Sequence, residues 1–482
     1  MKPVPALSTT LRRGASACVP LLLAACAVSA PPAKVDAQAP AAWQAAAPHQ
    51  ASLTDLNQWW RSQGDPVLAQ LIEQAQAASP TVSTARSRIF QARAQSVAAG
   101  AALLPSVDGA ASVSRASQQS ALPLGTTSQA GFQAAWEIDL FGERRAQRRA
   151  AEERLAGAGA LWHEARVSVA AETASQYIAL RSCTALLAVA EQDAASRRDT
   201  SRLTELTTQA GFQSPANAAL ARASAAEGSI RVTQQQAQCE LDIKALVALT
   251  AVPEPALRQQ LNGAATNTGL APIEITALPA QLLAQRPDVF NAERAVAAAS
   301  ADVGSAQADR YPRLSLQGAV GVANFRAGGE NTKLDTWTIG PLAVTVPVFD
   351  GGRRRANVDA ARAAYEDAVL NYRAVARQAV REVEEALVNL QSTARRGDDA
   401  RTALDGYRYA FRATEDLYKN GLASLLQLED ARRTRLNAEN ALVTLDQERN
   451  AAWIALYRAA GGGWTSAAPL PALASNPAAS SH

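Results

Sequence analysis

Apolar and polar side chains alternate along residues 131–141, GFQAAWEIDLF, as is typical of a strand with one apolar face. The apolar positions are Phe132, Ala134, Trp136, Ile138 and Leu140. A run of about ten residues has the length of a transmembrane β-strand. The later run TWTIGPLAVTVPVF, 336–349, alternates less regularly, and Pro341 and Pro347 remove hydrogen-bond donors from a strand there. A half-buried sheet of a water-soluble protein would show the same alternation, so the pattern alone leaves both interpretations open.

The chain contains two copies of one sequence pattern, offset by 207 residues at the prolines that begin each copy. Pro80 and Pro287 each begin an alanine-rich helical segment, and each segment ends at a second proline 25 residues later, Pro105 or Pro312. Two further pairs of segments match in the same order, DLFGERRAQ (139–147) with VFDGGRRRA (348–356) and QAGFQS (209–214) with KNGLAS (419–424). The pattern therefore indicates an internal duplication.

Each copy predicts the same order of elements: a helix of about 24 residues, two strands, a helix of about 67 residues, a glycine break and a helix of about 35 residues. No proline lies between Pro123 and Pro215, or between Pro347 and Gly421, so helices of this length are permitted. The long helix would extend roughly 100 Å, and the two short ones together roughly 90 Å. We therefore expect the long helix to pack beside the two short ones, stacked end to end, with an irregular segment at 251–279 outside the stack.

The first 25 residues have the pattern of a secretory signal peptide. Lys2, Arg12 and Arg13 precede an apolar run that ends in LAAC and is too short to span a bilayer. The LAAC segment resembles the lipobox of bacterial lipoproteins, so we expect Cys26 to begin the mature chain and to carry acyl chains. Ala27 stands where lipoproteins of the inner membrane typically have aspartate, which favours the outer membrane. An apolar run with an incidental cysteine is the alternative.

Composition indicates long helices and excludes several classes of function. Aromatic residues make up only 5% of the chain, and strong helix formers predominate. Loss of the signal peptide reduces the 47 basic side chains by three to 44, which equals the 44 acidic ones, so no nucleic acid partner is implied. The three histidines are far apart, which argues against a histidine metal site and against a His-based catalytic pair. We expect no enzymatic activity and no cofactor.

Six motifs, in order, resemble the outer membrane factors, the TolC-like channels, and most closely their NodT-type lipoprotein branch, which serves resistance-nodulation-division (RND) efflux pumps. The motifs are WRSQGDPVLAQLIEQA (60–75), AAWEIDLFGERR (134–145), RPDVFNAERAVAAA (286–299), YPRLSLQG (311–318), VPVFDGGRRRANV (346–358) and LYRAAGGGW (456–464). Four strands per chain cannot close a barrel, and lipid does not tolerate an open sheet edge. The resemblance implies a mainly α fold with a membrane β-barrel, in which a homotrimer closes one twelve-stranded barrel that continues as a twelve-helix periplasmic α-barrel.

The duplication and the resemblance together divide the chain into six parts. These are a signal peptide (1–25), a lipidated N-terminal linker and equatorial segment (26–79), a first repeat (80–250), an equatorial linker (251–286), a second repeat (287–460) and a C-terminal equatorial tail (461–482). In this scheme a barrel strand leaves the membrane just before Arg353, Arg354 and Arg355. We expect these arginines to lie near the lipid headgroups, where cationic ends on long stems are favoured.

The resemblance places Gly211 and Gly421 at the periplasmic tips of two helical hairpins. Together with Tyr418, these tips would be the docking site of a periplasmic adaptor protein. Helix termination alone also explains a glycine at such a position.

The family's tip pattern places the periplasmic gate at Leu426, Gln427 and Asp430. In a trimer, Leu426 would form an apolar constriction and Asp430 an acidic ring that attracts cations. Ala423 and Gln427 stand where an arginine and an aspartate are expected in the best-known member of the family, which argues against locking by salt bridges at these positions. Asp430 as an ordinary solvated helix residue is the alternative.

Cys183 and Cys239 lie 28 residues before and 28 residues after Gly211. Antiparallel helices joined at that glycine would bring the two cysteines to the same height, and the periplasm is oxidising, so we predict a disulfide between them. Two buried free thiols that face away from each other are the alternative.

Taken together, these features predict a passive export channel for small molecules such as drugs, metal ions or metabolites. Its expected partners are two further copies of the chain, outer-membrane lipid, a periplasmic adaptor and an inner-membrane RND pump that supplies the energy. The channel of a type I protein secretion system is the main alternative. A periplasmic adaptor would have one hairpin flanked by β domains, and a coiled-coil scaffold would leave the Trp136 strand without a role, so both are less favoured.

Overall fold

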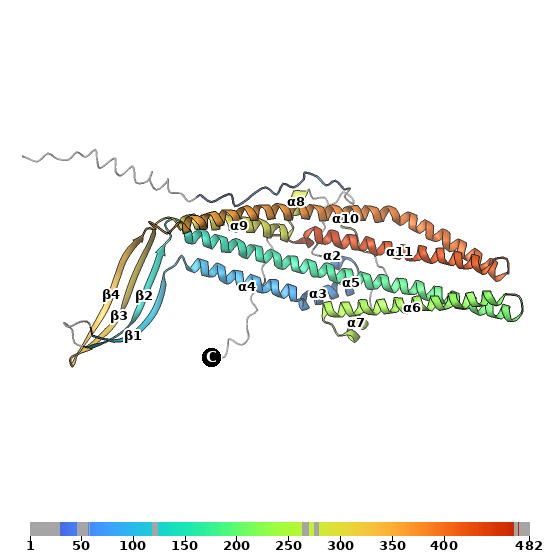
Figure 1. The fold of residues 1–482 in the computed structure, drawn as a ribbon, viewed down its shortest axis with the longest axis horizontal. Coiled ribbons are helices and arrows are strands. Elements are labelled where there is room, and N and C mark those ends of the chain that lie inside the picture. The colour runs from blue at the N-terminus through green and yellow to red at the C-terminus, as the bar shows by residue number, and fades with distance from the viewer. Residues whose placement is uncertain are drawn as a thin grey trace, which may run out of the picture. The chain divides into compact units, whose positions relative to one another are not determined.

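The computed structural model describes residues 29–45, 56, 58–117, 124–262, 269–273, 279–466 and 471 (Figure 1). The expected signal peptide and Cys26 lie outside these residues. The chain folds as two compact units, each built from separate stretches of sequence. Unit 1 comprises the residues up to Asp36, Arg88–Ala158 and Asn291–Arg373, and unit 2 comprises Ala37–Ser87, Gly159–Phe290 and the residues from Ala374.

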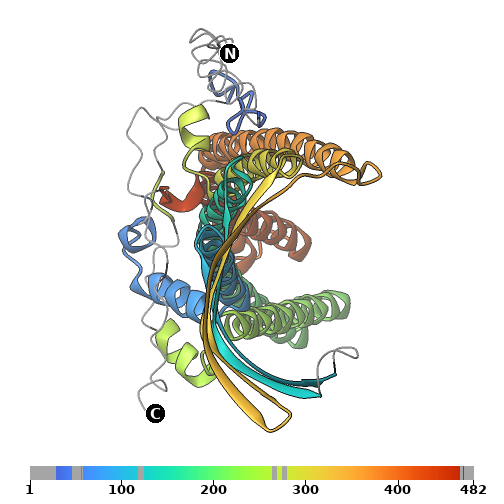
Figure 2. The same ribbon diagram turned by 90° about the vertical axis from the view of Figure 1, so that its left-hand side faces the viewer.

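Unit 1 contains an antiparallel sheet, which within the described residues has four strands in the order β1-β2-β3-β4. The strands are β1 (Ser106–Ala116), β2 (Gly125–Ile138), β3 (Arg313–Ala327) and β4 (Glu330–Thr345). Figure 2 shows that the sheet is strongly curved. Gly131 lies opposite Gly321, and a Cβ on Gly131 would stand 2.5 Å from the carbonyl oxygen of Val320, so glycine permits the close approach of β2 and β3.

The register of the sheet separates an apolar row from a polar row. Phe132 on β2 lies opposite Val320 on β3, which lies opposite Trp337 on β4, and all three side chains are exposed. The next row contains Gln133, Ala319 and Thr338. The alternation that the sequence predicts for β2 is therefore present, and β4 carries it too, although the β3–β4 register shifts between Leu316 and Gly318, near Pro341.

Both long helices begin directly after the sheet in unit 1 and end in unit 2. They are α5 (Glu143–Gln209) and α10 (Arg353–Lys419), and each contains 67 residues, as the sequence predicts. Asp139 accepts hydrogen bonds from the backbone nitrogens of Arg144 and Arg145, at 3.2 and 2.9 Å, and so caps α5. Asp350 caps α10 in the same way through the nitrogens of Gly352 and Arg354. Each carboxylate satisfies backbone donors that the helix itself leaves unpaired.

Small side chains allow the helices of unit 1 to pack closely. Ala150 on α5 forms a buried cluster with Ala298 and Ala301 on α9 (Pro287–Ala308), and Gly157 on α5 leaves room for Asn291. The other short helix, α4 (Pro80–Ala101), contains 22 residues, as α9 does. Both are slightly shorter than the predicted length.

The main apolar core lies in unit 2. It is formed by α2 (Trp59–Ser62), α3 (Pro66–Ala78), α5, α6 (Pro215–Thr250), α10 and α11 (Leu425–Ala459). The rings of Trp59, Trp60 and Tyr457 pack against one another with centroids 4.4 to 5.2 Å apart. The short elements α8 (Pro279–Leu283) and η2 (Gly461–Gly463) complete unit 2. None of the helices in the described part of the chain is long and apolar enough to cross a membrane.

One prediction for unit 2 was wrong in part. The segment 251–279 is not wholly irregular, because its first part forms helix α7 (Glu254–Leu261). Pro255 is accommodated in the first turn, Leu257 is fully buried, and Arg258 pairs with Glu254 one turn earlier at 2.8 Å. These contacts stabilise a short helix that periodicity does not reveal over so few residues.

Candidate functional site at the hairpin tips

The glycines at the two hairpin tips end the long helices in the same way. Gly211 and Gly421 have φ values of +81° and +74°, a region that side chains disfavour. The backbone nitrogen of Phe212 donates to the carbonyl of Thr207, and that of Leu422 to the carbonyl of Leu417, each at 2.8 Å. These bonds satisfy the last carbonyls of α5 and α10 and reverse the chain.

A serine then begins the returning helix in each hairpin. The hydroxyl of Ser214 accepts a hydrogen bond from the backbone nitrogen of Asn217 at 3.2 Å. At the other tip the backbone nitrogens of Ser424 and Gln427 bond each other's side chains, at 2.8 and 3.3 Å, which forms a capping box. The side chain of Gln427, which we expected at the gate, is thus engaged in capping α11.

The other two expected gate residues, Leu426 and Asp430, lie one turn apart on α11. Leu426 is exposed, and so is Asp430, whose carboxylate forms an ion pair with the exposed Arg433. Tyr418 is buried instead, and its hydroxyl lies 2.7 Å from Oγ1 of Thr204. That contact joins α10 of the second hairpin to α5 of the first.

A buried ionic cluster lies beneath the tips and joins the two hairpins through Glu429. The carboxylate of Glu429 on α11 accepts hydrogen bonds from Nη1 of Arg197 on α5 at 2.7 Å and from the hydroxyl of Ser224 on α6 at 2.9 Å. It also pairs with Arg432, one turn further along α11. A single carboxylate therefore connects three helices.

Arg432 is a fully buried charge of this cluster, with 0% of its surface exposed. Its guanidinium donates to Oγ1 of Thr200 at 2.8 Å and to Oγ of Ser196 at 3.1 Å, both on α5. Burial lowers the pKa of Arg432, but arginine remains charged in proteins. The guanidinium of Arg435 lies 4.0 Å from the ring centre of Phe411, a cation–π contact that holds α10 against α11.

This cluster was not predicted from the sequence. Glu429 and Arg432 are spaced for a pair on one helix, as are Asp193 and Arg197, so each pair could have been recognised alone. The link between Arg197 and Glu429 spans 232 residues and has no sequence signature. The cluster lies at positions other than Ala423 and Gln427, the two that we considered for salt bridges.

The predicted cysteine pair lies further along the first hairpin. Cys183 on α5 and Cys239 on α6 form a disulfide, with the sulfurs 2.09 Å and the Cα atoms 5.5 Å apart. Both residues are buried. No group of three or more His, Cys, Asp or Glu residues in the described ranges could hold a metal ion.

Comparison with known proteins gives a consistent result along most of the chain. Residues 71–252 and 278–462 match the model of a family described as outer membrane efflux protein. The chain is 29% identical over 474 residues to the pyoverdine export outer membrane protein OpmQ of Pseudomonas aeruginosa, covering 94% of this chain and 96% of that protein. It is 26% identical over 441 residues to nodulation protein T of Rhizobium leguminosarum bv. viciae, covering 90% of each. Its structure is similar to that of the outer-membrane channel OprN, with a TM-score of 0.75, 27% identity and coverage of 90% of this chain and 97% of that one.

Proposed function

Because the chain belongs to the outer membrane efflux protein family, we propose that three copies of it form one export channel that is driven by an inner-membrane pump. The family consists of outer-membrane channels and not of enzymes, and the fold of the chain is that of the TolC-like channels. The resemblance predicted from the six motifs is confirmed.

The sheet of unit 1 is the observation that carries the proposal. Its outer strands β1 and β4 have no second partner within the described residues, and one face presents the exposed apolar row of Phe132, Val320 and Trp337. Lipid offers no hydrogen-bond partners, so an apolar sheet with open edges needs strands from other chains. Three copies would supply twelve strands, enough for one closed barrel.

The helices support the same assembly. Large apolar side chains are exposed on the long and returning helices, among them Leu206, Leu220, Leu370 and Leu417. In a helical barrel, neighbouring chains would cover these side chains. We propose that residues 80–250 and 287–460 form the two repeats of the channel wall, strands included. In the same proposal, 26–79 form a lipidated linker and an equatorial segment, 251–286 an equatorial linker and 461–482 an equatorial tail.

The N-terminal segment supports a lipid anchor at Cys26. In unit 1 the carbonyl oxygens of Pro31 and Pro32 accept hydrogen bonds from Ser300 at 2.6 Å and from Tyr365 at 2.8 Å. Ala30 packs against Gly304 near the end of α9, which precedes β3 by a few residues. Cys26 is four residues before Ala30 and so within reach of the membrane end of this helix. Acyl chains on Cys26 would enter the inner leaflet there.

At the other end of the helices, we propose that the hairpin tips form the gate and the adaptor-docking surface. The polar cluster around Glu429 and the contact of Tyr418 with Thr204 would hold the two hairpins of each chain together in the closed state. Leu426 and Asp430 are exposed in the single chain and would face the axis. At the extreme tips Phe212 and Leu422 are 82% and 75% exposed, which suits an apolar contact with an adaptor hairpin.

The names of similar proteins support the proposal that the cargo consists of small molecules. The names of two relatives refer to pyoverdine export and to solvent efflux. We propose a comparable role for this chain, with an RND pump and its adaptor as partners. The channel itself would bind no cofactor. Deletion followed by susceptibility tests against drugs, metal ions and solvents would identify the cargo class.

The sheet allows a sharper test of the channel. Arginine on a lipid-facing strand costs about 2–4 kcal/mol, whereas lumen-facing substitutions mainly change selectivity. Trp337→Arg should therefore reduce the amount of heat-resistant trimer in outer-membrane fractions. Its neighbour on the opposite face, Thr338→Arg, should retain the trimer and alter ion selectivity in planar bilayers. Equal trimer yields and unchanged conductance for both variants would contradict the proposal.

A further inference from the structure

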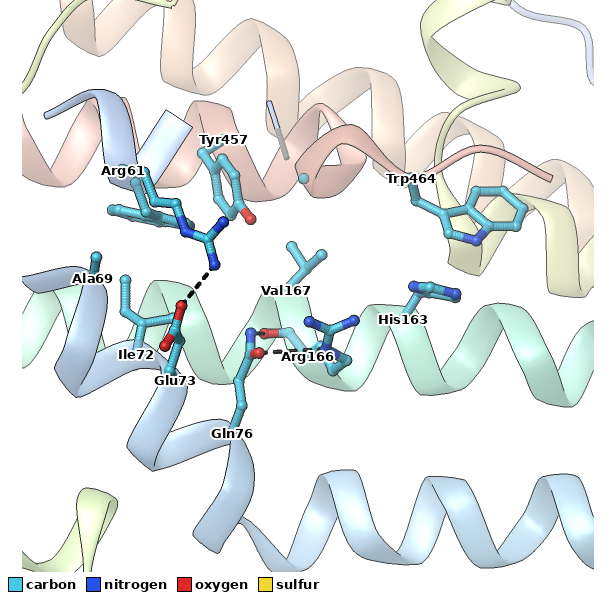
Figure 3. A pocket seen from close by; sticks show the side chains of 12 residues that line it. Arg61, Ala69, Ile72, Glu73, Gln76, His163, Arg166, Val167, Tyr457 and Trp464 are labelled. Atoms are coloured by element: carbon cyan, nitrogen blue, oxygen red, sulfur yellow. Dashed lines mark hydrogen bonds and ion pairs between the residues drawn. The ribbon is translucent and has the colours of Figure 1, made fainter. Parts of the chain in front are cut away.

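A small pocket of about 180 Å³ lies in unit 2, away from the hairpin tips (Figure 3). Helix α3, helix α5 and the chain around η2 contribute its walls. In Figure 3 the guanidinium of Arg166, the amide of Gln76 and the hydroxyl of Tyr457 point into the same space. The export function proposed above assigns no role to this pocket.

Arg166 is held in a fixed orientation at the base of the pocket. Its Nε donates to Oε1 of Gln76 at 3.3 Å, and Nε2 of Gln76 donates to the carbonyl oxygen of Arg166 at 2.9 Å. The guanidinium also lies over the ring of Trp162, 5.0 Å from its centre. These contacts engage Nε and one face of the Arg166 guanidinium. Its two terminal nitrogens form no hydrogen bond to the protein among the described residues. A guanidinium held in this way presents a rigid pair of donors.

The positive charge of Arg166 is not neutralised within the described chain. No carboxylate lies within 4.0 Å of it there, and the nearest acidic residue of the lining, Glu73, pairs with Arg61 at 2.9 Å at the exposed rim. His163, which also lines the pocket, adds no charge near neutral pH, because burial and the charge of Arg166 lower its pKa to about 4. The buried Nε2 of His163 has no hydrogen-bond partner in the described residues.

The remaining lining determines the shape of the space. Tyr457 and Val167 are buried, and the indole of Trp464 stands beside His163. Gly462 has a φ of +60°, and a Cβ at this position would lie 2.5 Å from Val167 and 3.0 Å from the Tyr457 hydroxyl. Glycine at position 462 therefore leaves room for the side chains of Val167 and Tyr457. Burial raises the pKa of Tyr457, so its hydroxyl stays protonated and can donate.

We infer that this pocket binds a small organic carboxylate, with the carboxylate on the terminal nitrogens of Arg166 and its apolar body against Trp464 and Val167. Paired donors of a guanidinium match the two oxygens of a carboxylate, and such bidentate, charge-assisted hydrogen bonds are the strong ones. The Tyr457 hydroxyl is placed to donate a further bond. Aromatic and aliphatic walls with a few convergent polar groups are typical of small-molecule sites.

The probe 4-fluorobenzoate tests this inference, with the neutral isostere 4-fluorobenzamide as its control. Fluorine NMR line broadening on the full-length, detergent-solubilised protein should reveal binding of the benzoate only. Arg166→Gln should weaken it at least tenfold, and Arg166→Lys, which keeps the charge but loses the paired donors, should weaken it less. Tyr457→Phe should weaken it two- to threefold. Arg198→Gln removes an exposed arginine of the same helix, outside the pocket, and should leave binding unchanged.

Two results would overturn the inference. Equal broadening of the benzoate and benzamide signals would show that charge is not recognised. Equal benzoate binding by the wild type, Arg166→Gln and Arg198→Gln would show that the pocket is not the site. Retention of the secondary structure and of the melting temperature identifies the variants that have folded. None of these readouts depends on transport.

Discussion

Replacing Glu429 by glutamine tests whether the buried ionic cluster closes the channel. The substitution keeps the size of the side chain and removes its charge. Glu429 accepts hydrogen bonds from Arg197 and Ser224 and pairs with Arg432. Without its carboxylate, the fully buried Arg432 keeps only neutral partners on α5, the hydroxyls of Ser196 and Thr200.

The structure sets the size of the effect. Hydrogen bonds to charged groups contribute about 1.5–3 kcal/mol each, and breaking a buried ion pair costs about 3–5 kcal/mol. Arg197 keeps its ion pair with Asp193 at 2.7 Å, so the cost should lie at the lower end of the range for a buried ion pair. We therefore expect the substitution to destabilise the closed state by about 3 kcal/mol per chain. If these contacts exist only in the closed state, the balance between closed and open forms shifts roughly a hundredfold per chain, because 1.4 kcal/mol corresponds to a factor of ten.

The assay is single-channel conductance in planar bilayers, together with sensitivity of cells to antibiotics too large for a closed channel. Glu429→Gln should raise the open fraction and the sensitivity. Glu415→Gln is the matched control, because Glu415 forms an ion pair with Lys419 at 3.2 Å on the same hairpin, and such surface helix pairs contribute only about 0.3–0.5 kcal/mol. A Glu429→Gln trimer that assembles normally and conducts like the wild type would refute the reasoning.

Three further outcomes are expected. Replacing Cys183 and Cys239 by serine should lower the free energy of unfolding by about 4 kcal/mol, because the bridge closes a loop of 56 residues. Urea titrations with and without reductant measure this free energy. Equal stability with and without reductant would argue against the bridge. Gly421→Ala should lower the free energy of unfolding by about 1 kcal/mol because of the positive φ at this position. Gly406→Ala, inside α10 with open space around it, should raise the free energy of unfolding by about 0.5–1 kcal/mol. Thermal melts measure both changes, and the reverse order would exclude the backbone explanation. The pKa of His163 is about 4 in the folded state and about 6.5 in the unfolded state, so between these pH values the unfolded chain binds the extra proton. The free energy of unfolding should therefore fall as the pH drops through that window. His163→Gln should reduce this pH dependence in unfolding curves, and an unchanged pH dependence would assign it to other groups.

Local patterns predicted the larger part of the fold. Uninterrupted, proline-free stretches gave the two 67-residue helices, and alternation around Trp136 gave strand β2. The duplication added the equivalence of Gly211 and Gly421, and the equal spacing of Cys183 and Cys239 from Gly211 pointed to the bridge. Each of these inferences depends on residues that are close in sequence or related by the repeat.

Contacts between distant segments were not predictable in this way. Glu429 contacts Arg197 only because two hairpins pack together. Arg166 and Tyr457 line one pocket only because three segments converge. The capping role of Gln427 could be predicted from the sequence, because serine followed three residues later by glutamine is the pattern of a capping box. The family resemblance indicates a gate position for Gln427, whereas the local pattern indicates a helix cap.

The open edges of the sheet also bear on gene dosage. If three chains must meet before β1 and β4 find partners, a chain that has crossed the inner membrane alone cannot yet enter the outer membrane. Barrel closure and insertion then become a single event whose rate rises more steeply than in proportion to chain abundance when chains are scarce. A modest change in promoter strength would consequently alter export capacity out of proportion to the change in messenger RNA.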